Sequence, residues 1–194
     1  MVTLKILHLG LWSDTHRAVR LGLIWIPTTA MLDWLLGLYS AEEMGLVWKK
    51  SRQTGWVVEL AVFIASAMFF SGLFCGTARA SVLDAFLFQK TGLLVGALAQ
   101  QFLVESYVFV RLERVVGNKA PLAAAAVFSL AHWPNRTLVL ITFTGGLASS
   151  LTFKWCRNLY ALALAHGIIG AALPSFWKIN MRVGKSFLSH FHGS

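Results

Sequence analysis

Apolar runs long enough to cross a lipid bilayer constrain this chain more than any other feature of its sequence. A transmembrane helix needs about 20 mainly apolar residues, and residues 56–77 and 159–176 form two runs of about this length. Of the 194 residues, 57% are hydrophobic and 13% are charged, whereas about 25% of the residues in a soluble domain are charged. We therefore expect an integral membrane protein with helical spans, because a helix satisfies its own backbone hydrogen bonds in lipid.

The distribution of apolar runs predicts an all-α fold, a polytopic transmembrane helical bundle. We expect about six spans, a short amphipathic helix at residues 78–90, and a single integral membrane domain over residues 1–194. A polar loop at residues 40–55 separates the first two spans, and the small residues "GGLASS" in the fifth predict close helix packing. The expected spans are residues 19–39, 56–77, 92–110, 120–133, 137–153 and 159–176.

The net charge of +9 raises the question of a nucleic-acid partner. The 17 Lys and Arg residues lie mainly between and beside the apolar runs, where they contact lipid headgroups and guide insertion. No stacking motif or basic face accompanies them, so we expect the lipid bilayer as partner and no nucleic acid. We expect a multi-pass protein of the bacterial inner membrane or an equivalent membrane, although an even division of basic residues between the two sides of six spans leaves its orientation open.

Polar side chains inside the spans gather in the second half of the chain. Gln100, Gln101 and Glu105 occur in the third span, His132 ends the fourth, and His166 lies well inside the sixth. Gln101 and Glu105 are four residues apart and therefore share one face of a helix. Polar residues in a membrane usually face the bundle interior. An isolated His or Gln there is often only an interhelical hydrogen-bonding group, but five such residues on three helices indicate a functional centre.

Three short motifs carry a resemblance to a known family. They are "QQFLVE" at residues 100–105, "FSLAH" at 128–132 and "HGIIG" at 166–170. Their order and spacing resemble the CAAX prenyl endopeptidase and bacteriocin-processing (CPBP, Abi-like) intramembrane proteases, whose motifs are Glu-Glu-x-x-x-Arg, Phe-x-x-x-His and His-x-x-x-Asn. The resemblance covers about residues 92–175, so this segment is expected to form a CPBP-like core.

The resemblance implies roles for the motif residues, and this chain departs from several of them. In the family, the glutamates and histidines activate a water molecule, while the asparagine and the second histidine stabilise an oxyanion. Here Gln100 and Gln101 replace the glutamates, Glu105 replaces the arginine and Gly170 replaces the asparagine. An amide cannot take a proton from water near neutral pH. The resemblance thus leaves open whether this chain is an enzyme.

The first hypothesis is a divergent CPBP-type intramembrane endopeptidase. It would hydrolyse peptide bonds of a membrane-associated substrate, with Glu105 as the relocated base and His132 and His166 holding the water. Gln100 or Gln101 would donate a hydrogen bond to the developing oxyanion. No cofactor is required by this hypothesis.

Two alternatives use the same residues differently. One is a catalytically inactive protease-like scaffold, retained as a subunit of a membrane complex, in which the histidines only join helices. The other is a membrane metalloenzyme acting on a lipid or isoprenoid. Its Zn or Fe would be held by Glu105, His132 and His166, a two-histidine, one-carboxylate set.

Overall fold

The computed structural model of the protein describes residues 28–29, 31–48, 51–77 and 91–181. Within these ranges the secondary structure consists of helices and turns without a strand, which confirms the predicted all-α class. The chain divides into two compact units after Ser40, and the second unit carries the helices considered below. Residues 19–27 and 30 of the span predicted at 19–39 and all of the amphipathic segment at 78–90 fall outside the described residues, and the single domain stays a prediction.

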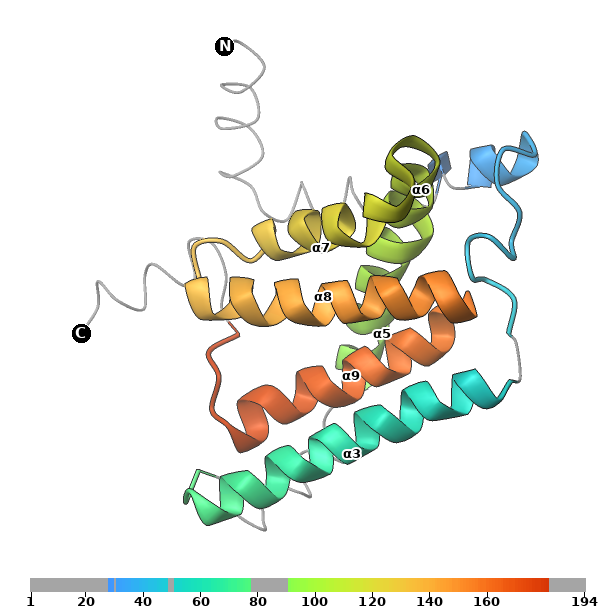
Figure 1. The fold of residues 1–194 in the computed structure, drawn as a ribbon. Coiled ribbons are helices and arrows are strands. Elements are labelled where there is room, and N and C mark those ends of the chain that lie inside the picture. Colours follow the sequence, from blue (N-terminus) through green and yellow to red (C-terminus); the bar gives the residue numbers. More distant parts are fainter. Residues whose placement is uncertain (1–27, 30, 49–50, 78–90, 182–194) are drawn as a thin grey trace. The chain divides into compact units, whose positions relative to one another are not determined.

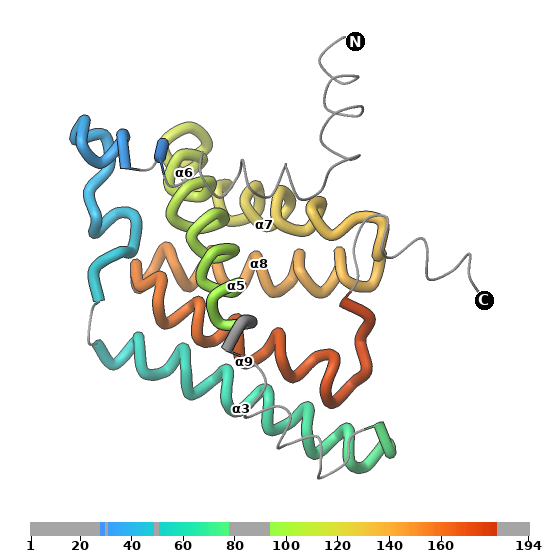
Figure 2. Tube along the Cα trace, turned by 180° about the vertical axis from the view of Figure 1, so that it is seen from behind, coloured from blue at the N-terminus to red at the C-terminus, as the bar shows by residue number. Residues whose placement is uncertain are grey.

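The second unit is built from helices that pack side by side. In Figure 1, α7, α8, α9 and α3 follow one another across the unit, and Figure 2, seen from the opposite side, shows α5 passing in front of α8 and α9. The elements are α3 (Arg52–Phe74), α5 (Thr91–Gln101), the π-helix η1 (Phe102–Phe109), α6 (Val110–Val116), the 3-10 helix η2 (Gly117–Lys119), α7 (Ala120–Leu130), α8 (Arg136–Cys156) and α9 (Leu159–Phe176).

Three of these helices, α3, α8 and α9, are long and apolar enough to cross a membrane. They coincide with the spans predicted at 56–77, 137–153 and 159–176. Helix α7 has 11 residues and is therefore about 16 Å long at 1.5 Å per residue. This is much less than the roughly 30 Å of a bilayer core, so α7 alone does not span the membrane. Six spans are thus not confirmed.

Side-chain caps fix where the long helices begin. Ser51 Oγ accepts from Thr54 N at 3.2 Å at the start of α3, and Asn135 Oδ1 accepts from Leu138 N at 3.1 Å at the start of α8. Asn158 caps α9 in the same way. Ser and Asn are favoured at these positions because a short side-chain oxygen satisfies an otherwise free N–H of the first turn.

Helices α3 and α9 run in the same direction along their contact. Near their starts, Asn158 Nδ2 donates to Thr54 Oγ1 at 3.3 Å, and beyond their ends Thr77 Oγ1 donates to the Phe176 carbonyl at 2.7 Å. Helix α8 runs the opposite way, because only two residues connect it to α9. Between these two hydrogen bonds, α3 and α9 share an apolar core formed by Ala65, Met68, Ala172, Leu173 and Phe176.

The third predicted span is helical but not a regular α-helix. Elements α5, η1 and α6 follow one another without a break, so the helical segment extends past the expected end at residue 110 to Val116. In η1 each backbone hydrogen bond joins residues that are five apart; for example, Val110 N donates to the Glu105 carbonyl oxygen. Such π-helical segments are rare and occur frequently at functional sites, and this one contains Glu105, the acidic residue of the first motif.

Candidate functional site

Gln101 is the centre of a hydrogen-bond network between three helices. Its side chain is 6% exposed at the end of α5. Its Nε2 lies 3.2 Å from His166 Nδ1 on α9, and its Oε1 accepts from Ser149 Oγ on α8 at 3.2 Å. The first and third sequence motifs therefore meet directly, because Gln101 belongs to "QQFLVE" and His166 to "HGIIG".

Glu105 lies one turn further along the same helical face. Its side chain has no exposed surface. Oε1 accepts from Ser150 Oγ at 3.1 Å, while Oε2 is buried without a hydrogen-bond partner. Gln101 and Glu105 thus contact neighbouring serines of α8, as expected for residues four apart on one face. Within the described residues, no hydrogen bond joins Glu105 to His132 or His166.

Phe128 joins the second motif to the network. Its ring contacts the His132 ring edge to face, with centroids 4.9 Å apart, and the His166 ring at 6.0 Å. Its carbonyl oxygen lies 2.9 Å from His132 Nδ1. A Cβ added to Gly146 would lie only 3.1 Å from Phe128 Cδ1, so the glycine allows α8 to approach α7 closely here.

Two residues named from the sequence have a different environment from the one expected. The side chain of Gln100 is exposed, so it does not join Gln101 in the network. Gly170 is buried one turn after His166, and a Cβ added to it would meet only the His166 ring, at 3.6 Å. The glycine supplies no side-chain amide where the family motif has an asparagine, and the amide that contacts His166 is that of Gln101.

The three residues suggested as metal ligands are not grouped together in the structure. No group of three His, Cys, Asp or Glu side chains in the part of the chain that the structure describes is arranged to hold a metal ion. Glu105, His132 and His166 are all described. The metalloenzyme alternative therefore has no support in the arrangement of these three side chains.

Ser149 and Ser150 were missed as site residues. In the sequence they belong to "GGLASS", from which we predicted only close packing of the helix. Both hydroxyls donate to polar side chains of the first motif. The sequence signal that could have identified them is a pair of adjacent hydroxyls in an apolar span, because each hydroxyl needs a hydrogen-bond partner in a lipid environment. The sequence does not show which partner is near.

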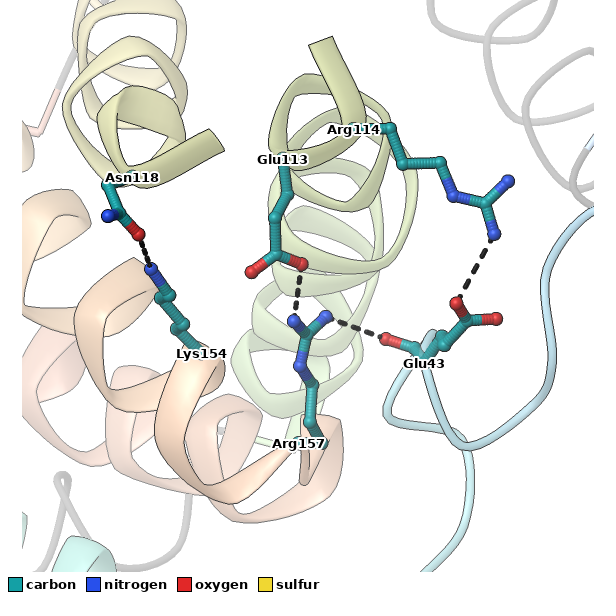
Figure 3. Close-up of polar contacts among 6 residues, drawn as sticks. All are labelled: Glu43, Glu113, Arg114, Asn118, Lys154 and Arg157. Atoms are coloured by element: carbon teal, nitrogen blue, oxygen red, sulfur yellow. Dashed lines mark hydrogen bonds and ion pairs between the residues drawn. The ribbon is translucent and has the colours of Figure 1, made fainter. Parts of the chain in front are cut away.

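A second group of polar residues lies at the end of the unit where α8 turns into α9 (Figure 3). Arg157 contacts the Glu113 carboxylate and donates to the Glu43 carbonyl oxygen at 3.1 Å. Arg114 pairs with the Glu43 carboxylate at 3.2 Å. These contacts hold the segment after Ser40 against α6 and the start of α9, and they share no residue with the network around Gln101.

The comparisons with known proteins concern the segment that carries this network. Residues 83–172 match the family model described as type II CAAX prenyl endopeptidase Rce1-like. All three motifs lie inside the matched segment, so the resemblance to the CPBP family is confirmed there and relates the chain to CAAX-type intramembrane proteases. No curated protein and no solved structure gives a significant match.

Proposed function

We propose, from the premise that residues 83–172 form an Rce1-like domain, that the protein is a divergent intramembrane endopeptidase. It hydrolyses a peptide bond of a membrane-associated substrate. The observation that supports this proposal best is the contact of Phe128 with both His132 and His166, together with the hydrogen bond from Gln101 to His166. Residues of all three family motifs are adjacent through these contacts although they lie on three helices.

Peptide hydrolysis needs a base for the attacking water and a donor for the oxyanion. The two imidazoles supply groups of both kinds, since a neutral imidazole has one donor and one acceptor nitrogen. Glu105 is the relocated base in this proposal, and its Oε2 has no other hydrogen-bond partner to give up. The carboxylate lies one turn, about 5.4 Å of helix, from the position of the second family glutamate. The scissile bond must be displaced accordingly, because a base acts only within hydrogen-bond reach of its proton.

The experiment uses the full-length protein reconstituted in liposomes. One substrate is a farnesylated peptide that ends in a C-a-a-X sequence, a second is the same peptide without the farnesyl group, and mass spectrometry identifies the products. We expect the wild type to cleave at one bond. Glu105→Gln and His132→Ala should each lower the rate by about 10²-fold or more. Thr144→Val is the control, because Thr144 is exposed and bonds only to its own helix.

The cleavage rates of the two variants test separately the role of Glu105 and the role of the histidines. Cleavage that survives both Glu105→Gln and His132→Ala would contradict the site. If cleavage survives only Glu105→Gln, the histidines remain the reaction centre and Glu105 is not the base. The prenylated and unprenylated peptides distinguish a requirement for the lipid group from recognition of the peptide alone.

A non-catalytic subunit is the second candidate, and one observation favours it. Both ends of the Gln101 amide are engaged, one with α8 and one with α9, which is how a purely structural interhelical residue behaves. This candidate predicts a stable partner that co-purifies from the native membrane and a cellular role that survives His132→Ala. A monodisperse protein without a partner would count against it.

A further inference from the structure

The hydrogen bond of His132 determines which of its ring nitrogens carries the proton. Nδ1 lies 2.9 Å from the Phe128 carbonyl oxygen. A carbonyl oxygen only accepts hydrogen bonds, so Nδ1 must be the donor. A neutral imidazole has a single N–H, and therefore His132 Nε2 carries a lone pair.

The hydrogen bond of His166 determines the opposite arrangement. Nδ1 lies 3.2 Å from Gln101 Nε2, and an amide nitrogen only donates. Nδ1 of the neutral ring is therefore the acceptor, and Nε2 carries the proton. The Ser149 hydroxyl donates to Gln101 Oε1 at 3.2 Å, and with the amide in this orientation Nε2 faces the ring.

We propose that His132 and His166 are held in opposite neutral tautomers and that Gln101 is the positioning residue that sets the tautomer of His166. His132 then offers an acceptor at Nε2, and His166 offers a donor at Nε2. Neither Nε2 has a hydrogen-bond partner in the described part of the chain. Both atoms are therefore free for a ligand that contains a donor and an acceptor.

Gln101 thereby does more than remove a carboxylate from the family motif. A glutamate at this position would accept from Nδ1–H of His166 and hold the ring in the other tautomer, with a lone pair at Nε2. Both histidines would then be acceptors. With Gln101, the pair consists of one acceptor and one donor, which compensates for the missing asparagine of the third motif.

The catalytic consequence rests on the proposed function. His132 Nε2 accepts a hydrogen bond from the attacking water, and His166 Nε2–H donates to the carbonyl oxygen of the scissile peptide. The water transfers a proton to Glu105, the base of the proposed function, as its oxygen bonds to the peptide carbon. His166 stabilises the resulting oxyanion. One acceptor and one donor are the groups that a water molecule and a peptide carbonyl require.

Nitrogen NMR of the full-length protein tests the tautomers without requiring activity. The protein is labelled with ¹⁵N at its histidines and reconstituted in nanodiscs at a pH where both rings are neutral. Protonated and unprotonated ring nitrogens resonate at well-separated shifts, and His132→Asn and His166→Asn assign the signals. We expect a protonated Nδ1 at His132 and a protonated Nε2 at His166. The same tautomer in both rings would overturn the proposal.

Gln101→Glu tests the role assigned to the amide. It should move the proton of His166 from Nε2 to Nδ1 and leave His132 unchanged. Gln100→Glu is the matched control, because it adds the same charge at the exposed neighbouring position and should change neither ring. Ser149→Ala should yield a mixture of His166 tautomers, since the amide is then free to turn over. An unchanged His166 signal in Gln101→Glu would refute the assignment.

These results are separable from the proposed function. Opposite tautomers in a protein that cleaves no peptide would leave the assignment intact and contradict only the peptidase activity. Identical tautomers in a protein that cleaves peptides would contradict the tautomer assignment and leave the proposed peptidase activity intact.

Discussion

Gly45 lies where the segment after Ser40 meets the start of α9. Its carbonyl accepts from Leu159 N at 3.0 Å, and its φ of +68° is in the left-handed region that favours glycine. A Cβ at this position would lie 2.5 Å from Phe153 Cε2 and 3.2 Å from Leu159 N. Gly76 has nearly the same φ, +70°, but open space around the site of its missing Cβ.

Substitutions at these two glycines separate the free-energy cost of a steric overlap from the cost of an unfavourable backbone conformation. Both Gly45→Ala and Gly76→Ala strain the backbone by about 1–2 kcal/mol. Only Gly45→Ala also overpacks the contact with Phe153, for which about 1–3 kcal/mol is typical. We therefore expect the free energy of unfolding in mixed detergent micelles to fall by about 1–3 kcal/mol more for Gly45→Ala. Equal losses would mean that the contact with Phe153 does not form.

Ser150 provides the hydrogen bond to a carboxylate that has no exposed surface. Ser150→Ala removes the donor to Glu105 Oε1, and an unsatisfied buried polar group costs about 1–3 kcal/mol. The same substitution in a Glu105→Leu background should cost less than about 0.5 kcal/mol, since no carboxylate remains. A double-mutant cycle on the free energy of unfolding measures the difference. Additive effects would show that the hydroxyl does not stabilise Glu105.

At the scale of single elements, Asn158 determines how α9 begins and what it contacts. Its Oδ1 accepts from Ala161 N at 3.2 Å, and its Nδ2 reaches Thr54 on α3. One buried side chain thus caps one helix and joins it to another. The position of His166, two turns into α9, depends on this start.

Asn158→Ala should destabilise the helix pair through both contacts. Loss of an N-cap costs about 1 kcal/mol, and loss of the hydrogen bond to Thr54 costs about 1 kcal/mol more. Asn118→Ala is the control, because Asn118 is exposed and its side chain accepts only from Lys154 at 2.6 Å; its effect should stay within about 0.5 kcal/mol. Thermal unfolding in detergent compares the two variants, and similar unfolding midpoints would contradict the role of Asn158.

At the scale of the whole second unit, the described basic residues gather at one end. The starts of α3 and α9 meet there through Asn158 and Thr54, and Figure 3 shows contacts between the end of α8 and helix α6 at the same end. An excess of Lys and Arg marks the cytoplasmic side of a membrane protein. The residues at this end are Arg52, Arg111, Arg114, Lys119, Lys154 and Arg157, whereas Arg136 and Lys178 lie at the other end.

This distribution predicts an orientation that the count for six spans left open. We expect Asn118 on the cytoplasmic side and the exposed Cys75, which follows α3, on the opposite side. In intact cells, a membrane-impermeant maleimide should label native Cys75 in a Cys156→Ser background. Asn118→Cys, in a chain that lacks both native cysteines, should be labelled only after permeabilisation. Labelling of both from the same side would contradict the arrangement of α3, α8 and α9.

The features that depend on neighbouring residues could be predicted from the amino-acid sequence alone. The length of the apolar runs placed three membrane-length helices, and the four-residue spacing put Gln101 and Glu105 on one face. The motifs pointed to the family, because their order along the chain is a property of the sequence. The partner of each polar side chain follows instead from the packing of the helices: Gln101 bonds to His166 and Ser149, Glu105 bonds to Ser150, and Gln100 is exposed. Those contacts join residues 45 to 65 positions apart, and they depend on how closely and at what rotation the helices pack, which no local pattern records.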